Sequence, residues 1–460
     1  MSLNNITRIA IAIVSVGALS SCHIYNKYSM STDTELTAEY VEATKSEVDS
    51  SAFGNLRWQE VFTDPYLAQL INTALENNVN LSNAKLNIDI AQAQLKGARL
   101  SYLPSVTFAP NGAGASYDHS PMTWSYTLPL AVSWEVDIFG KLLNTNRKAK
   151  ASLLQSEAYE QAVKSQLIAG VANCYYTIAM LEKQLKISRE TAQIWKENVD
   201  VMKNLKLAGR VTESAVVQST ANYYSILASI TDLEVSVHEA NNTMSLLMNT
   251  MPQTWNISAD AEFTTPTIIR EGVPMKELAS RPDVRAAEQN VAVAYYATNM
   301  ARSAFYPALT ISSNGGFTNL LGSVISNPGK WFITLAGQLT APIFARGQLY
   351  ANLEATRAQQ QQAMNNFEYT LLSASKEVSE ALLLYEKSSQ KAELLSQQVE
   401  NLEKAVEYTE DLLTLSGTST YLEVLTAQQS LLSAQISQVT CQNAKARAAI
   451  NLYQSLGGGR

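Results

Sequence analysis

The feature that most constrains this chain is a fifteen-residue stretch, 124–138, in which every even-numbered position is apolar. The apolar positions are Trp124, Tyr126, Leu128, Leu130, Val132, Trp134, Val136 and Ile138. Only a β-strand directs alternate side chains to opposite faces, so one face of this segment must meet an apolar environment. Soluble strands average about 5–6 residues, and a tilted strand crosses a bilayer in about 9–11. The stretch therefore indicates either a membrane strand with Trp in both aromatic girdles or a long sandwich strand with one solvated face.

Composition narrows the class of partner. The 460 residues are 46% hydrophobic and only 16% charged, with a formal net charge of −7. An acidic balance of this kind argues against nucleic acid as a partner.

The N-terminus predicts export and lipidation. Arg8 precedes an apolar run, Ile9 to Leu19, which is too short for a transmembrane helix and typical of a secretory signal. The following Leu-Ser-Ser-Cys resembles the bacterial lipobox, which would make residues 1–21 the signal peptide and Cys22 the lipidated first residue. The alternative is an ordinary cleaved signal with an incidental cysteine. His23, rather than Asp, follows the cysteine, which resembles lipoproteins passed on to the outer membrane.

Later segments offer no run of about 18 apolar residues, so any crossing of the membrane must be made by strands. The two remaining cysteines, Cys174 and Cys441, fall in long helical segments at heights too different for a disulfide. We expect both to be packed thiols.

The sequence repeats itself after about 203 residues. Ala98-Arg99, Tyr102 and Pro104 are answered by Ala301-Arg302, Phe305 and Pro307, and each series leads into an alternating strand hairpin. This predicts a tail over 22–62, a first repeat over 63–250, a linker over 251–277 and a second repeat over 278–460. The predicted strand hairpins are 104–138 and 307–343, and the long helical hairpins that follow them are 139–250 and 346–456.

The helical segments are unusually long and lack internal proline. Apolar residues step by four and three along each of them, which indicates antiparallel coiled coil. The predicted seam positions include Leu181, Leu185, Ser188, Ala192, Trp195, Val199 and Met202 in the first copy and Leu422, Leu425, Gln429, Leu432, Ile436 and Val439 in the second. The reversals fall at Gly209 and Gly417, where glycine supplies a left-handed residue and a following Thr or Ser caps the next helix.

Two hairpins supply four strands, whereas a single-chain membrane barrel needs about eight. Open strand edges are too costly in hydrocarbon, so membrane strands of this chain must share a barrel with other copies. The residues alone thus predict an oligomeric conduit whose helices extend into the periplasm.

Three motifs are specific to one family. Trp58 with Val61-Phe62 and Asp64-Pro65 forms an opening motif, Arg281-Pro282-Asp283-Val284-Arg285 heads the second repeat, and Tyr421 to Gln428 follows the second turn. Over nearly the whole mature chain the sequence resembles the outer-membrane efflux ducts of the TolC, OprM and CusC type, in their lipoprotein branch. The resemblance implies an α+β membrane protein: a homotrimer that shares a twelve-stranded transmembrane β-barrel, continued by an α-helical periplasmic barrel. It also implies a periplasmic membrane-fusion adaptor and an inner-membrane pump as partners.

The same resemblance assigns candidate sites. The tunnel constriction corresponds to Leu422, Glu423 and Thr426, and Thr426 departs from the acid often found in the family. Glu423 alone could supply an acidic ring, or it could be a solvated outer-face residue; the first-copy equivalent, Ala215, also lacks an acid. The adaptor-docking tips correspond to Gly209, Arg210, Val211, Gly417, Thr418 and Ser419, although these turns could also serve only to reverse the chain.

The sequence contains no recognisable catalytic or metal-binding motif. The three His, at 23, 119 and 238, do not cluster, and His238-Glu239 lacks the second His of a zinc protease motif. Asp283 is expected to be structural, in a helix first turn where a carboxylate is favoured. We therefore expect no catalytic residue, metal or cofactor, and the eleven Met form no string of soft ligands for copper or silver.

The leading prediction is a passive exit duct for efflux of drugs or other small compounds across the outer membrane. One alternative is the same duct serving type I protein secretion. Another, of a different class, is a non-conducting coiled-coil lipoprotein that acts as a periplasmic spacer, which would not need alternating strands.

Overall fold

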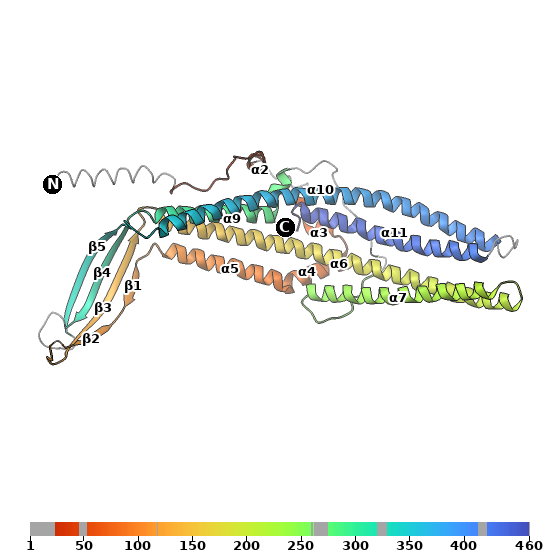
Figure 1. Ribbon diagram of the computed structural model, residues 1–460, viewed down its shortest axis with the longest axis horizontal. Coiled ribbons are helices and arrows are strands. Elements are labelled where there is room, and N and C mark those ends of the chain that lie inside the picture. The colour runs from red at the N-terminus through yellow and green to blue at the C-terminus, as the bar shows by residue number, and fades with distance from the viewer. Residues whose placement is uncertain are drawn as a thin grey trace. The chain divides into compact units, whose positions relative to one another are not determined.

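The computed structural model describes residues 24–45, 53–116, 118–258, 261, 275–319, 329–412 and 421–459. Cys22 and the second turn, with Gly417, Thr418 and Ser419, lie outside these residues. The described chain is α+β, with long helices and one antiparallel sheet (Figure 1). Among its helices, none is both long enough and apolar enough to span a membrane.

The elements follow one another in two similar series. The first comprises α2 (Glu35–Lys45), the short η2 (Phe53–Asn55), α3 (Trp58–Val61), α4 (Pro65–Asn77), α5 (Val79–Leu100), β1 (Ser105–Phe108), β2 (Asn111–Ala115), β3 (Thr123–Val136), α6 (Lys141–Leu207) and α7 (Glu213–Leu247). The second comprises α8 (Met275–Ser280), α9 (Pro282–Ser303), β4 (Ala308–Thr318), β5 (Lys330–Thr340), α10 (Gln348–Asp411) and α11 (Tyr421–Ser455).

The chain divides into two compact units, and each draws on both series. Unit 1 contains Met1–Ala38, Leu86–Ala158 and Arg285–Tyr369, and therefore the sheet. Unit 2 contains Glu39–Lys85, Tyr159–Val284 and Thr370–Arg460, and therefore most of both helical hairpins, whose first helices, α6 and α10, begin in unit 1.

The sheet of unit 1 has the strand order β1-β3-β4-β5, with β2 also paired to β3. All of these pairings are antiparallel, and the register places Leu128 opposite Phe317 and Phe317 opposite Trp331. Even-numbered residues of β1 to β3 thus share a face with odd-numbered residues of β4 and β5. This face carries the large apolar residues of β3, β4 and β5, interrupted by Ser313 and by glycines, and the predicted alternation is confirmed.

Two strand boundaries differ from those expected. The strand expected to run to Ile138 ends at Val136, because Asp137 accepts the backbone N–H groups of Leu142 and Leu143 at 3.1 and 2.7 Å and so serves the start of α6. The first strand, expected to be continuous, is divided into β1 and β2. Pro110, which lies between them, has no N–H to donate to the ladder.

Unit 2 buries the heptad positions of α6 as predicted. Seven consecutive seam residues are less than 10% exposed: Leu181, Leu185, Ser188, Ala192, Trp195, Val199 and Met202. In α11 the predicted seam is confirmed at Leu425 and Val439, which are buried, and is wrong at Leu422 and Gln429, which are exposed. Gln428 is buried in place of Gln429. The opening of α4 is confirmed: Pro65 is its first residue, and the Asp64 carboxylate accepts the Tyr66 N–H at 2.8 Å. Cys174 and Cys441 are free and buried.

Candidate functional site at the first turns of helix α11

The three residues expected to narrow the tunnel share one exposed face of α11. Leu422 is 66% exposed, Glu423 lies in the first turn, and the Thr426 hydroxyl donates to the Leu422 carbonyl at 2.7 Å. All three side chains are exposed, whereas their neighbours Val424 and Leu425 are buried. Residues at spacing i, i+4 lie on one side of a helix, so the structure brings these three together as one outward surface.

Behind this surface lies an apolar cluster that joins three helices. Its buried members are Ala192 and Trp195 of α6, Ile226 of α7 and Leu425 of α11. Trp195 is only 1% exposed, and its Nε1 has no hydrogen-bond partner within the described residues. The cluster therefore holds the start of α11 by packing rather than by polar contacts.

A chain of polar contacts joins α11 to α6 and α10. The Gln428 amide donates to Glu410 Oε1 of α10 at 2.8 Å and accepts from Asn198 Nδ2 of α6 at 2.8 Å. The Tyr421 hydroxyl donates to the Asn198 carbonyl at 3.3 Å. Burial, together with the nearby Glu410 carboxylate, raises the pKa of Tyr421 to about 12. The first turn of α11 is thus fixed to α6 and α10 by side chains on the face opposite Leu422.

The loop that reverses the chain between α6 and α7 is fixed by hydrogen bonds at the C-terminal end of α6. The N–H of Arg210 donates to the Leu205 carbonyl and that of Gly209 to the Lys206 carbonyl, both at 2.9 Å, which is a Schellman motif. Gly209 has φ +70°, a left-handed conformation in which a Cβ is strained. Thr212 occupies the N-cap position of α7, but its side chain makes no capping bond, contrary to expectation. Lys206 and Glu213 form an ion pair across the turn.

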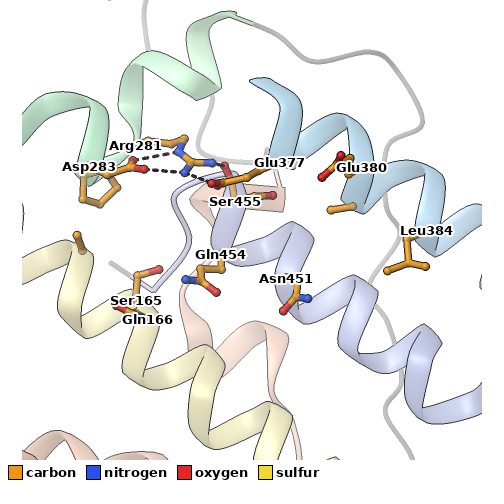
Figure 2. Close-up of a pocket in the computed structure, with 13 residues that line it drawn as sticks. Ser165, Gln166, Arg281, Asp283, Glu377, Glu380, Leu384, Asn451, Gln454 and Ser455 are labelled. Carbon is orange, nitrogen blue, oxygen red and sulfur yellow. Dashed lines mark hydrogen bonds and ion pairs between the residues drawn. The ribbon is translucent and has the colours of Figure 1, made fainter. Parts of the chain in front are cut away.

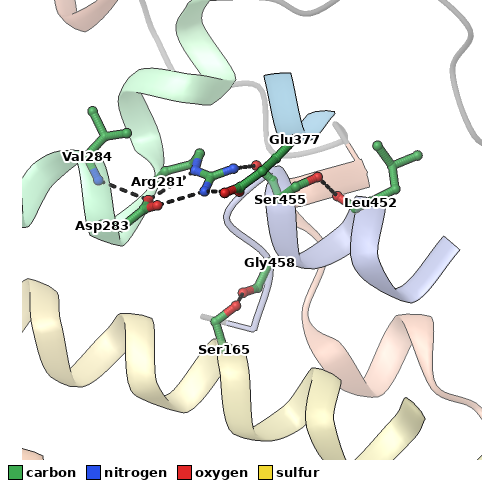
Figure 3. Close-up of polar contacts among 8 residues, drawn as sticks. All are labelled: Ser165, Arg281, Asp283, Val284, Glu377, Leu452, Ser455 and Gly458. Atoms are coloured by element: carbon green, nitrogen blue, oxygen red, sulfur yellow. Dashed lines mark hydrogen bonds and ion pairs between the residues drawn. The ribbon is translucent and has the colours of Figure 1, made fainter. Parts of the chain in front are cut away.

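The Arg281-Pro282-Asp283 segment is a structural clamp in unit 2 (Figure 3). Arg281 is 5% exposed; its guanidinium donates to both Asp283 oxygens, to Glu377 Oε2 at 2.8 Å and to the Ser455 carbonyl. Burial alone would lower the pKa of Arg281, but Asp283 and Glu377 outweigh it and raise the pKa. The single side chain thus ties the start of α9 to α10 and to the end of α11, as expected for a structural rather than a catalytic Asp283.

The clamp borders a cavity of about 640 Å³ (Figure 2). The cavity is lined mostly by polar side chains of α6, α10 and α11, including Gln166, Glu380, Asn451 and Gln454. Within the described residues, no group of three or more His, Cys, Asp or Glu side chains is arranged to hold a metal ion.

Next to the clamp, residues after α11 are buried against α6. The Gly458 carbonyl accepts the Ser165 hydroxyl, and the Gly459 N–H donates to Tyr453 Oη at 2.8 Å. A Cβ at Gly458 would lie 2.5 Å from the Tyr453 ring, so only glycine fits. Sequence reasoning missed this attachment; three consecutive glycines are usually a sign of a flexible linker.

Comparisons with known proteins agree on one class. The "Probable outer membrane lipoprotein SilC" of Salmonella typhimurium is 28% identical, covering 89% of both chains. The "Pyoverdine export outer membrane protein OpmQ" of Pseudomonas putida is 30% identical, also over 89% of both. The solved open state of the Neisseria gonorrhoeae outer membrane channel MtrE matches with a TM-score of 0.81 and 27% identity, covering 90% of this chain and 94% of the other.

The model of one protein family, described as "Outer membrane efflux protein", matches residues 70–250 and 273–458. These two segments make up most of the chain, and they confirm the family predicted from the motifs. The chain belongs to the outer membrane efflux protein family.

Proposed function

We propose that the protein is one subunit of a passive exit duct in the outer membrane. It forms the outer component of a tripartite, RND-type efflux system and releases small compounds to the exterior. The observation that carries this proposal is the sheet of unit 1, which combines an exposed apolar face with two edges that no described strand covers.

The apolar face fits hydrocarbon rather than water. Large side chains on it are strongly exposed, among them Trp331 (72%), Ile333 (69%) and Leu335 (79%). The other face of β5 carries the polar Lys330, Thr334, Gln338 and Thr340 together with Phe332 and Ala336. β4 and β5 have 11 residues each, which matches the length of a tilted strand across a bilayer.

The free edges require further copies of the chain. β1 and β2 pair with successive parts of β3 and together occupy one strand position at an edge of the sheet. The sheet is therefore four strand positions wide, and β5 forms its other edge. Each unpaired backbone group in hydrocarbon costs several kcal/mol, and closed membrane barrels start at about eight strands. Three subunits with four strand positions each would form a twelve-stranded barrel, in agreement with the homotrimer that the family resemblance implies.

The exposed face of α11 is the proposed constriction. Leu422 forms an apolar pinch, Glu423 supplies a ring of negative charge when repeated by symmetry, and Thr426 is a weaker polar neighbour. Support comes from their common exposure, since a residue that lines a lumen must not be packed inside its own subunit. The attachments of Tyr421 and Gln428 on the opposite face hold this surface in place.

The partners and the membrane anchor are also proposals. Gly209 and Arg210, which are exposed, and the partly exposed Val211 are the proposed docking residues of the first turn for a periplasmic adaptor. Gly417, Thr418 and Ser419, outside the described residues, are those proposed for the second. The adaptor connects the duct to an inner-membrane pump. Lipidation of Cys22 anchors the chain to the outer membrane; the lipoprotein SilC supports this assignment by its name. We retain the predicted duplication, which is supported by the two segments of the family match.

The duct is not an enzyme in this proposal, because transport through an open passage needs no reacting group. Efflux is favoured over type I protein secretion because the family is described as one of efflux proteins and OpmQ is named for the export of a small molecule. A non-conducting spacer would leave the exposed apolar face of the sheet without a purpose.

The test measures oligomeric state and conductance of the same purified protein. We expect a trimer in mild detergent and a low conductance in planar bilayers that rises several-fold in Leu422→Ala. Leu394→Ala is the matched control, because Leu394 of α10 is also 66% exposed but lies outside the proposed constriction. A monomer that passes no ions would refute the duct, and equal conductance of both variants would refute the constriction.

A further inference from the structure

A cavity of about 450 Å³ lies in unit 1 where strands join helices. Its lining residues are Ile24, Arg302, Phe305, Tyr306, Tyr350, Leu353 and Arg357. Arg302 belongs to the last turn of α9, Phe305 and Tyr306 precede β4, and Tyr350 lies in the first turn of α10 after β5. The cavity therefore lies at the helix-side ends of β4 and β5.

The lining of this cavity combines apolar and aromatic side chains with positive charge. Five of its seven lining residues are aliphatic or aromatic, two are arginines and none is acidic. The Phe305 and Tyr350 rings meet edge to face with centroids 5.2 Å apart, and Tyr306 stacks on Phe139 at 4.9 Å. The cavity thus offers an ordered aromatic wall with positive charge beside it.

The two guanidinium groups have no carboxylate partner among the described residues. Neither Arg302 nor Arg357 takes part in a described salt bridge, and Arg302 donates only to the neutral Asn299 Oδ1, at 3.0 Å. Both also border a second, polar cavity that includes Asp33 and Glu368, and there the Glu368 carboxylate accepts the Thr34 hydroxyl at 3.1 Å. Two cations beside an apolar wall are complementary to an anion that carries a hydrocarbon tail.

We propose that this cavity binds one anionic phospholipid, with the phosphate on Arg302 and Arg357 and the start of an acyl chain against Phe305, Tyr350 and Leu353. This inference rests on the proposed function, because it requires the strands to lie in the membrane. Their helix-side ends then lie at the level of the lipid headgroups, where aromatic belts form and basic pockets hold acidic lipids. A free phosphate would leave the aromatic wall unused, and the chain's own acyl groups on Cys22 would leave both arginines unpaired.

The experiment uses purified trimers in detergent and native mass spectrometry with added phosphatidylglycerol or phosphatidylcholine. We expect one phosphatidylglycerol per subunit, and binding at least tenfold weaker for phosphatidylcholine. In the double variant Arg302→Gln/Arg357→Gln, phosphatidylglycerol binding should fall roughly twenty-five-fold, since each basic residue near a headgroup contributes about a factor of five. Arg285→Gln/Arg447→Gln removes the same charge from exposed positions outside the cavity and should bind like the wild type.

Further measurements separate the possible occupants. Cys22→Ser, which cannot be acylated, should bind phosphatidylglycerol as the wild type does; stronger binding would show that the chain's own lipid fills the cavity. Complete displacement by millimolar inorganic phosphate would show a simple anion site and would overturn the proposal. So would equal binding of both lipids, or unchanged binding in Arg302→Gln/Arg357→Gln.

The failure of this inference can be distinguished from the failure of the duct. Oligomeric state and conductance are measured on the same preparations, and Arg302→Gln/Arg357→Gln should retain both. Loss of lipid selectivity with an intact conducting trimer refutes only the lipid site. A wild-type protein that is monomeric and does not conduct refutes the duct on which the site depends.

Discussion

The sheet of unit 1 and the helical hairpins of unit 2 treat large apolar side chains in opposite ways. Leu335, in the middle of β5, is 79% exposed, whereas Trp195, in the seam of α6, is 1% exposed. Burying such a side chain contributes about 1.5–3 kcal/mol, so the helices obtain this stabilisation within the chain while the sheet does not. The sheet therefore depends on other molecules to cover its apolar side chains, whereas the helical hairpins are stabilised by their own packing.

The polar residues show the same contrast. On the sheet they lie opposite the apolar face and are set by simple alternation, as with Thr334 between Ile333 and Leu335. In unit 2 the buried polar side chains Arg281 and Gln428 each join helices that are distant in sequence. A change in the sheet should therefore act through lipid and assembly, and a change in the hairpins through the fold of each subunit.

The largest effect should come from a charge on the apolar face of the sheet. Leu335→Arg places a cation near the middle of β5, at a cost of about 2–4 kcal/mol per subunit at the bilayer centre and therefore about three times as much per trimer. Thr334→Arg, one residue away on the other face, is the control and should assemble nearly normally. The measurement is the fraction of membrane-inserted trimer by semi-native electrophoresis. Equal assembly of the two variants would show that the sheet does not face lipid.

Removing the central side chain of the helical seam should have the next largest effect. Trp195→Ala empties a fully buried site in the cluster with Ile226 and Leu425, which typically costs about 3–5 kcal/mol. Trp195→Phe, which keeps much of the volume and loses no hydrogen bond, should cost much less. Thermal or denaturant unfolding of the helices measures both. The difference in stability between Trp195→Ala and Trp195→Phe should be similar in detergent and in bilayers. A strong dependence on lipid would show that the helices, like the sheet, depend on their surroundings.

The parts of the structure that follow from periodicity could be predicted from sequence. Alternation in β3 and the four-three spacing of α6 report directly on which side chains are buried, because each pattern is repeated many times. In α11 the same spacing located the buried Leu425 and Val439 but took Gln429 instead of its neighbour Gln428, because two adjacent glutamines give no difference in polarity by which to choose. The exposed Leu422 illustrates the converse, an apolar residue away from its own core.

The contacts that join distant residues could not be predicted. The partners of Arg281, at Glu377 and Ser455, lie 96 and 174 positions away, and no local pattern connects them. The first-turn position of Asp283 could be predicted, because helix starts have local signals. The division of the first strand follows from Pro110, whose missing N–H is a local property that can be read in advance.

Breaking the clamp should have an intermediate effect, confined to the helices. Arg281→Gln removes a buried charge that makes four hydrogen bonds to Asp283, Glu377 and Ser455, and should cost about 2–3 kcal/mol. Arg285→Gln, at an exposed position in the first turns of α9, is the control and should change stability by less than about 0.5 kcal/mol. Chemical denaturation followed by circular dichroism measures the two. If the variants unfold alike, the clamp contributes little to stability.

The turn at Gly209 allows a test of backbone conformation alone. A Cβ at Gly209 would meet nothing within 4 Å, so Gly209→Ala should destabilise the hairpin only through its φ of +70°, by about 1–2 kcal/mol. A Cβ at Gly97, in the last turn of α5, also meets nothing, and there Ala should stabilise by up to about 1 kcal/mol. Shifts of opposite sign in the melting temperature are expected. Shifts of the same sign would point to an unrecognised contact at the turn.

The smallest effect at neutral pH should come from Tyr421→Phe, which removes the hydrogen bond to the Asn198 carbonyl and should cost about 0.5–1.5 kcal/mol. The sharper comparison is made at alkaline pH. Burial raises the pKa of Tyr421 to about 12, whereas an unfolded tyrosine loses its proton near pH 10. Between these values the unfolded state releases the proton first, so wild-type stability should fall as pH rises from about 10 to 12.

Phenylalanine has no proton to lose at this position, and every other tyrosine is common to the two proteins. The difference in unfolding free energy between wild type and Tyr421→Phe should therefore be constant below about pH 10, fall by up to about 1.4 kcal/mol for each pH unit above it, and change sign before about pH 12. Parallel curves would show that the Tyr421 phenol is not held in the neutral state by its surroundings in unit 2. A loss confined to this range would instead show that the first turn of α11 is stabilised within its own subunit, unlike the apolar face of the sheet.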